Sequence, residues 1–178
     1  STTQAMKSVG YAASGVGNHD FDYGVDTLRA RAKAAGFPFL AGNVKPAKRQ
    51  DELPFEPYVI TEINGVRIGV IGALDESIQS RMNPESAEAL VVTNPAKSVQ
   101  ATLSALSSYG VDLTILLFHG NQKATLALAQ SLPGLDLLVT GGLRNGSPEH
   151  TTTYYKLANG VHVATTPPGN GGVGYVDL

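Results

Sequence analysis

The stretch VDLTILLF, residues 111–118, decides the class of fold. It is a nearly continuous apolar run of strand length, and a strand of this kind is expected where both faces of a sheet are covered. A helix is predicted on either side of it, at residues 94–109 and 123–131, and a second buried strand follows at 135–140. Helices that alternate with buried strands predict an α/β fold in packed layers.

Two Asn-Gly pairs predict hairpins. Asn64-Gly65 and Asn159-Gly160 each separate two short runs of β-branched and other apolar residues. Both central residues of a type I′ turn need positive φ, so Asn-Gly between such runs is a strong hairpin signal. The runs are 58–63 with 66–71, and 154–157 with 161–165. Hairpins add antiparallel pairs to the sheet, which we therefore expect to be mixed.

The composition bounds the function classes. The chain has 178 residues, 42% of them hydrophobic, and a net charge of −2, which predicts one globular domain over residues 1–178 and gives no electrostatic basis for binding a nucleic-acid polymer. The absence of cysteine excludes thiol nucleophiles and thiolate metal sites. No apolar run reaches the length of a membrane-spanning helix, so no membrane insertion is expected.

The most informative polar segment is GNHDFDYG, residues 17–24, between an apolar strand at 12–16 and a helix at 25–35. Asn18, His19 and Asp20 offer a carbonyl oxygen, an imidazole and a carboxylate where α/β folds place ligands, at the carboxyl end of a strand. An oxygen ligand beside an oriented histidine suits a metal and a phosphate. The alternative is a polar loop whose Asn and Asp satisfy local backbone groups.

Two further strand ends carry candidate residues. His119 follows the run at 111–118 and precedes Gly120, which would let a ligand approach closely, so it is a candidate metal ligand. Arg144 follows the glycines 141 and 142, whose backbone N–H groups could hold an anion that the guanidinium clamps. The alternatives are a structural histidine and a tight turn with a solvent-facing arginine. His150, His162 and the pair Asp75-Glu76 are expected to be structural.

The segment GNHDFDYG resembles the GNH(D/E)-F-D-x-G motif of the calcineurin-like metallophosphoesterases, in their 5′-nucleotidase branch. Other segments resemble that branch in the same order along nearly the whole chain. They are FPFLAGNV (37–44), GVRIGVIG (65–72), residues 110–120, LDLLV (135–139) and residues 171–178. The resemblance implies a mixed-sheet β-sandwich flanked by helices in four layers. It also implies two metal ions at the strand ends, which activate water to hydrolyse a phosphate ester.

The resemblance also implies residue roles. Asn18 and His119 would be ligands of one metal, His19 would stabilise the transition state or protonate the leaving oxygen, and Asp20 would orient His19. The family's Gly-His-x-His motif falls on residues 141–144, where Gly142 and Arg144 occupy the histidine positions. Its Asp-x-His and Gly-Asp segments are expected upstream of Ser1, so the chain would be a partial domain whose first strands are missing. The metal could be Mn, Zn, Fe, Mg or Ca, or could have been lost.

Two hypotheses follow. The chain could be part of a phosphoric-ester hydrolase that acts on a nucleotide or another phosphate ester, with an incomplete dinuclear site. Alternatively, it could be a catalytically inactive scaffold that serves in binding or assembly. A partner chain or domain could complete the fold, because missing strands would leave an open sheet edge. The resemblance implies a periplasmic or extracellular location.

Overall fold

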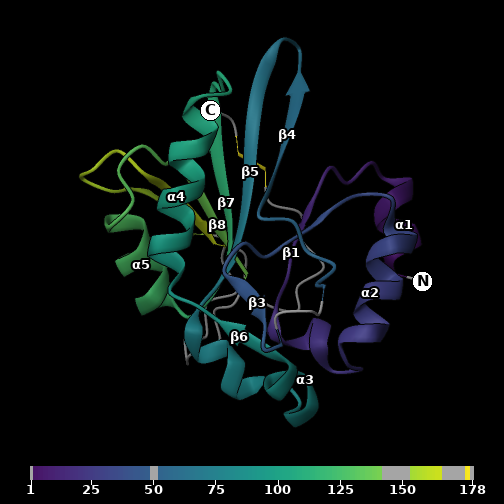
Figure 1. Ribbon diagram of the computed structural model, residues 1–178. Coiled ribbons are helices and arrows are strands. Elements are labelled where there is room, and N and C mark those ends of the chain that lie inside the picture. Colours follow the sequence, from purple (N-terminus) through teal and green to yellow (C-terminus); the bar gives the residue numbers. More distant parts are fainter. Residues whose placement is uncertain (1, 49–51, 142–152, 166–174, 177–178) are drawn as a thin grey trace.

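The computed structural model describes residues 2–48, 52–141, 153–165 and 175–176. Its elements form four layers, with a six-stranded sheet and a short two-stranded sheet between two pairs of helices (Figure 1). One outer layer contains α4 (Pro95–Ser107) and α5 (Gln122–Gln130), and the other contains α1 (Thr2–Ser8) and α2 (Val25–Ala35). The α/β class and the layered arrangement predicted from the sequence are confirmed. Within the described residues, no helix is long and apolar enough to cross a membrane.

The six-stranded sheet is mixed, as predicted, with the strand order β4-β5-β7-β8-β10-β9. The four inner strands are parallel to one another, and each edge strand is antiparallel to its neighbour. The strands are β4 (Tyr58–Ile63), β5 (Val66–Leu74), β7 (Leu113–His119), β8 (Leu137–Thr140), β9 (Thr153–Lys156) and β10 (His162–Thr165). The parallel strands end at one edge of the sheet, which is where β7 delivers His119.

The two faces of this sheet carry two separate cores. On β5, Ile71 and Ala73 pack with α4 residues such as Leu103 in what we call the helix-side core. Leu74 points to the opposite face and packs with Val16, Leu28 and their neighbours. We call this second cluster the ribbon-side core, because the short two-stranded sheet, or ribbon, covers this face. The alternation follows from the two-residue period of a strand. The sheet is therefore covered on both faces, which explains why β5 and β7 are so apolar.

The second sheet is a parallel ribbon of β1 (Ser14–Gly15) and β2 (Phe39–Leu40). It lies directly against β5, because a Cβ built on Gly72 would be only 2.2 Å from the carbonyl oxygen of Leu40. The backbone N–H of Gly42, just after β2, donates to the carbonyl of Gly72 at 2.8 Å. A glycine in β5 thus allows two layers to meet at backbone distance.

Asn43, which follows the ribbon, hydrogen-bonds to two other segments of the chain, at Leu74 and at Thr93. The side chain is fully buried and makes three hydrogen bonds. Its Nδ2 donates to the carbonyls of Leu74 at 2.8 Å and Thr93 at 2.7 Å, and its Oδ1 accepts from the N–H of Leu74 at 2.8 Å. One amide therefore joins the end of β5 to the segment that leads into α4.

Some predicted elements differ in the structure. The strands expected at 12–16 and 37–43 shorten to two residues each. After Leu40, the N–H groups of Ala41 and Gly42 donate to the carbonyls of Glu56 and Gly72 instead of pairing with β1. Residues 77–84, expected to be irregular, lie mostly in a 3₁₀ helix, η2 (Glu76–Arg81). Three elements were not predicted: α3 (Pro84–Ala89) and the antiparallel pair β3 (Val44–Pro46) and β6 (Leu90–Val92). The hairpin at Asn64-Gly65 is confirmed, with φ values of 52° and 82°.

Candidate active site

Asn18 and His119 meet at the edge where β7 ends. The Nε2 atom of His119 lies 3.0 Å from Oδ1 of Asn18, although the two residues are 101 positions apart in sequence. Phe118 belongs to the helix-side core, so His119 points to the opposite face, toward the ribbon. The two strand-end residues that the sequence singled out are therefore brought together.

Gly17 lets the loop after β1 pass against the imidazole. A Cβ built on Gly17 would be 3.0 Å from both Cε1 and Nδ1 of His119. The following residues form a 3₁₀ helix, η1 (Asn18–Phe21), in which Asp20 Oδ2 accepts a hydrogen bond from the Gly17 N–H at 2.8 Å. This contact folds the loop back on itself and directs Asn18 toward His119.

The histidine at position 19 is held by a different carboxylate from the expected one. His19 Nδ1 lies 3.0 Å from Oδ2 of Asp22, and both side chains are exposed, by 79% and 46%. Asp20 was expected to orient His19, but its carboxylate accepts from the Gly17 N–H instead. The reason is the 3₁₀ turn, which returns Asp20 to the start of the helix and places residue 22 beside residue 19.

Burial shifts the pKa values of two groups in this site. It raises the pKa of the Asp20 carboxyl above its ordinary value, although the Gly17 hydrogen bond and nearby His119 and Arg31 oppose the shift. Burial also lowers the pKa of the His119 imidazole, and His19 and Arg81 add to this effect while Asp20 opposes it. His119 is therefore neutral near pH 7, which is the form that ligates a metal.

The structure also identifies supporting residues that sequence reasoning missed. Asn83 Nδ2 donates to the carbonyls of Phe21 at 2.7 Å and Asp22 at 3.1 Å, which fixes the end of η1. The N–H of Asp75 donates to the carbonyl of His119 at 2.9 Å, so the end of the neighbouring strand β5 holds the histidine backbone. Asp22 lies in the motif at residues 17–24, so the sequence contains a signal for its role beside His19. No sequence signal marks Asn83.

None of the remaining candidates contributes a described contact to this site. Arg144, Gly142 and His150 fall outside the described residues. His162 lies on β10 and hydrogen-bonds to Tyr154 across the β9–β10 pair, in line with a structural role. Asp75 Oδ1 accepts from the N–H of Ser77 at 3.0 Å and caps η2, which is also a structural role.

Comparison with known proteins places this geometry in a family. No protein-family model matches the chain. A curated relative from Vibrio cholerae, named 5′-nucleotidase, is 30% identical over 151 residues, which cover 78% of this chain and 27% of the relative. The crystal structure of a 5′-nucleotidase precursor from Thermus thermophilus is 27% identical with a TM-score of 0.75, covering 93% of this chain and 34% of that one.

A second solved structure adds the wider family. The calcineurin-like phosphoesterase YfkN from Bacillus subtilis is 25% identical with a TM-score of 0.74, over 92% of this chain and 56% of that one. The chain is part of a metallophosphoesterase domain of the 5′-nucleotidase branch. It spans about a quarter of the length of the curated relatives it matches.

A metallophosphoesterase domain implies divalent metal ions, and the described residues match such a site only in part. Two ligands about 2.1 Å from one ion, at roughly a right angle, lie about 3 Å apart, and Asn18 Oδ1 and His119 Nε2 have that separation. However, no group of three or more His, Asp or Glu side chains that could hold a metal occurs within the described part of the chain. Two neutral donors do not fit a dinuclear centre by themselves.

Replacing Gly17 with alanine in this metallophosphoesterase domain should displace the His119 ring without unfolding the chain. The backbone of Gly17 is extended, with φ −125°, so alanine is tolerated there, but its Cβ would press on the imidazole at 3.0 Å. We expect a crystal structure of the variant to show the Asn18–His119 hydrogen bond broken and thermal stability nearly unchanged. Gly141→Ala is the control, because its Cβ would have no neighbour within 4 Å among the described residues. An intact hydrogen bond in Gly17→Ala would contradict the prediction.

The lowered pKa of His119 predicts an acid-sensitive contact. Folded His119 binds its proton less tightly than the unfolded chain does, so its contribution to stability is present above about pH 6.5 and is lost as the pH falls through the lowered pKa. NMR titration in the presence of a chelator should give a His119 midpoint below the ordinary 6.5. In urea unfolding, His119→Gln should lose less stability than the wild type between about pH 7.5 and about pH 5. A midpoint above 6.5 would contradict this.

Proposed function

We propose that the chain carries part of the catalytic face of a 5′-nucleotidase-like phosphomonoesterase, which hydrolyses nucleotides or other phosphate monoesters. The observation that supports this most directly is the 3.0 Å distance between Asn18 Oδ1 and His119 Nε2. His19 follows Asn18 directly in the chain. The names of the relatives and their similarity along the chain support the same reaction class.

His19 is the residue we propose for proton transfer. Asp22 accepts from Nδ1–H at 3.0 Å and fixes the tautomer, which leaves Nε2 without a partner among the described residues. When water attacks the phosphorus and the ester P–O bond breaks, protonated His19 gives its proton to the leaving oxygen. Its exposure leaves room for the leaving group. The family implies a divalent metal, which could be Mn, Zn, Fe, Mg or Ca, and Asn18 and His119 would supply two of its ligands.

The second candidate function is a scaffold without catalysis. One observation favours it: only two neutral donors converge at this edge of the described structure. In this case Asn18 and His119 would keep their hydrogen bond to each other, and the surface would bind a partner or a ligand.

We propose location outside the cytoplasm, and completion by another chain or domain, as further parts of the hydrolase hypothesis. Cell fractionation and native mass spectrometry would test these two points.

The experiment measures metal binding and hydrolysis separately. The full-length protein is titrated with Mn²⁺ and Zn²⁺ while the His119 ring signals are followed by NMR, and hydrolysis of p-nitrophenyl phosphate and adenosine monophosphate is assayed. We expect His119→Ala to abolish metal binding, and His19→Ala to keep it but lower kcat by about 10²-fold or more. His162→Ala is the control for a surface histidine. If the full-length wild-type protein binds neither metal in large excess, the hydrolase proposal is overturned in favour of the scaffold.

A further inference from the structure

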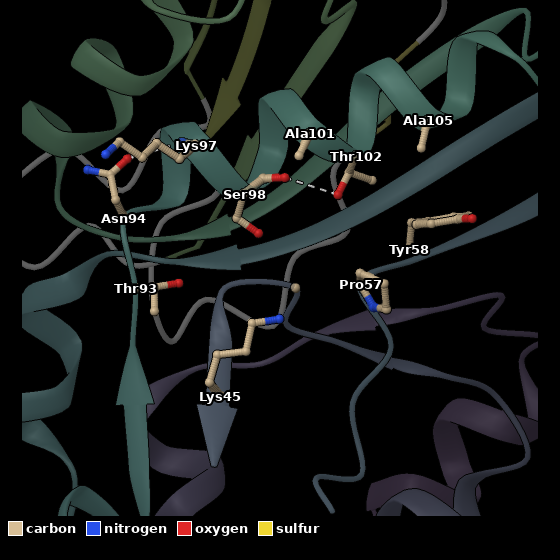
Figure 2. Close-up of a pocket in the computed structure, with 11 residues that line it drawn as sticks. Lys45, Pro57, Tyr58, Thr93, Asn94, Lys97, Ser98, Ala101, Thr102 and Ala105 are labelled. Atoms are coloured by element: carbon tan, nitrogen blue, oxygen red, sulfur yellow. Dashed lines mark hydrogen bonds between the residues drawn. The ribbon is translucent and has the colours of Figure 1, made fainter. Parts of the chain in front are cut away.

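An open groove of about 510 Å³ lies along α4, next to the edge strand β4 (Figure 2). One wall is α4 and the other is formed by Pro57 and Tyr58 at the start of the edge strand β4. Lys45 on β3 also lines the groove, so the groove lies at the β4 edge of the sheet and is not confined to one face. None of the residues around Asn18 and His119 lines it.

The groove is polar at one end and apolar at the other. Lys97 and Ser98 belong to the first turns of α4, and Ala101 and Ala105 follow about one and two turns later along the same wall. Figure 2 shows Thr93 and Asn94 at the end near Lys97, and Tyr58 and Pro57 at the end near Ala105. From Lys97 to Ala105 the helix rises about 12 Å, which is the length of a small organic molecule with a polar head.

The charge at the polar end is positive and unneutralised. Lys45 and Lys97 both line the groove, its lining contains no Asp or Glu, and neither lysine has an ion pair within the described residues. Figure 2 shows the Lys45 side chain extending into the groove from β3. This cationic end lies on a chain whose net charge is −2.

Some polar groups at this end form hydrogen bonds within the protein, and others are available to a ligand. Asn94 Oδ1 accepts from the Lys97 N–H at 3.1 Å, and Thr93 Oγ1 donates to the carbonyl of Asn43 at 2.9 Å. Thr102 Oγ1 donates to the carbonyl of Ser98 at 3.1 Å. The Ser98 hydroxyl and the two ammonium groups have no such role among the described residues. A hydroxyl and two cations are the groups that recognise a phosphate or phosphonate head.

We propose that this groove binds an organic phosphate or phosphonate that has a flat apolar group. The anionic head lies beside Ser98 Oγ and the Lys45 ammonium, and the flat group lies against Tyr58, Ala101 and Ala105. The Lys97 side chain, which Figure 2 shows directed toward Asn94, rotates toward the head when the ligand binds. The small side chains of α4 leave space for a ring, and Tyr58 gives it an aromatic neighbour. The binding site is independent of the hydrolase proposed above, because it shares no residue with it.

The test uses the whole chain and 1-naphthylphosphonate, whose carbon–phosphorus bond is not an ester and would survive any phosphoesterase activity. Binding is followed by the fluorescence anisotropy of the naphthyl group, which no tryptophan of the chain obscures. We expect a dissociation constant of about 1 mM or tighter. Inorganic phosphate, which has only the head, and 1-naphthol, which has only the flat group, should each bind at least about ten-fold more weakly.

Matched charge variants locate the ligand. Lys45→Glu, Lys97→Glu and Ala101→Glu should each weaken binding about five-fold or more. Lys123→Glu is the control for Lys97→Glu, since Lys123 also lies in the first turn of an Asn-capped helix but does not line the groove. Ser104→Glu is the control for Ala101→Glu, because it adds the same charge to α4 outside the groove. Circular dichroism confirms that each variant is folded.

Several results would overturn the proposal. They are no saturable binding at concentrations well above about 1 mM, equal weakening by Lys123→Glu or Ser104→Glu, and equal affinity for inorganic phosphate. Loss of binding in His119→Ala would also overturn it, because the ligand would then occupy the strand-end site. Unchanged binding in His119→Ala supports the groove, whether or not the chain hydrolyses phosphate esters.

Discussion

Replacing Gly72 with alanine is expected to prevent the chain from reaching its native fold. The added methyl would lie 2.2 Å from the carbonyl oxygen and 2.3 Å from the carbonyl carbon of Leu40. These are backbone atoms of β2, so the clash is relieved only if the ribbon separates from the sheet. Overpacking usually costs about 1–3 kcal/mol and more where the surroundings cannot yield, out of a total stability of about 5–15 kcal/mol. Circular dichroism and a thermal melt would measure the loss.

Gly69→Ala on the same strand provides the matched control. Its Cβ would lie 2.9 Å from Leu106 Cδ1 and 3.2 Å from Val111 Cγ1, on the helix side of the sheet. These atoms are the ends of side chains that can rotate, so this variant should remain folded with a modestly lower melting temperature. If Gly72→Ala and Gly69→Ala melt at the same temperature, the result contradicts the close backbone contact between Gly72 and Leu40.

Replacing Asn43 with leucine is expected to have the second largest effect on stability. The side chain is 0% exposed, and its removal leaves the N–H and carbonyl of Leu74 and the carbonyl of Thr93 without these partners. Each unsatisfied buried group costs about 1–3 kcal/mol, so a loss of about 3 kcal/mol or more in the free energy of unfolding is expected. Urea denaturation followed by circular dichroism would measure it.

Two further variants test whether hydrogen bonding, and not size, is the cause. Asn43→Asp keeps the shape but places a carboxylate oxygen against two carbonyl oxygens, so it should be similarly destabilising at about pH 7. Asn159→Leu is the control, because Asn159 also donates to a backbone carbonyl, that of Ala129 at 2.9 Å, but is exposed and can be replaced by water. A loss in Asn159→Leu as large as that in Asn43→Leu would contradict the prediction.

Periodic segments could be predicted from the sequence because their own residues determine them. The helix Val25–Ala35 and the strand Tyr58–Ile63 have the predicted bounds. The pairing of β3 with β6 could not be predicted, since three-residue strands, one of which contains Pro46, carry no period of their own. They pair because the long-range bonds of Asn43 bring their two segments together.

The site was predictable in its location but not in its contacts. Asn18 and His119 were expected at the same edge because both follow strands, and they meet there. Two carboxylates, Asp20 and Asp22, lay within reach of His19, and sequence spacing does not distinguish them. The 3₁₀ turn does, because it decides which carboxylate faces the imidazole. The role predicted for Arg144 stays a prediction, since that residue lies outside the described segments.

The arrangement of the central strands has a consequence for the order of folding. Strand β8 pairs with β7, and only α5 lies between them in the chain, so this pair forms by closing a short loop. By contrast, Gly15 of β1 lies against Leu117 of β7, and Asn18 and His119 meet across 101 positions, so these contacts close much longer loops. We therefore expect β1 and the loop after it to dock late, so that Asn18 reaches His119 near the end of folding and the site forms only when the domain is assembled.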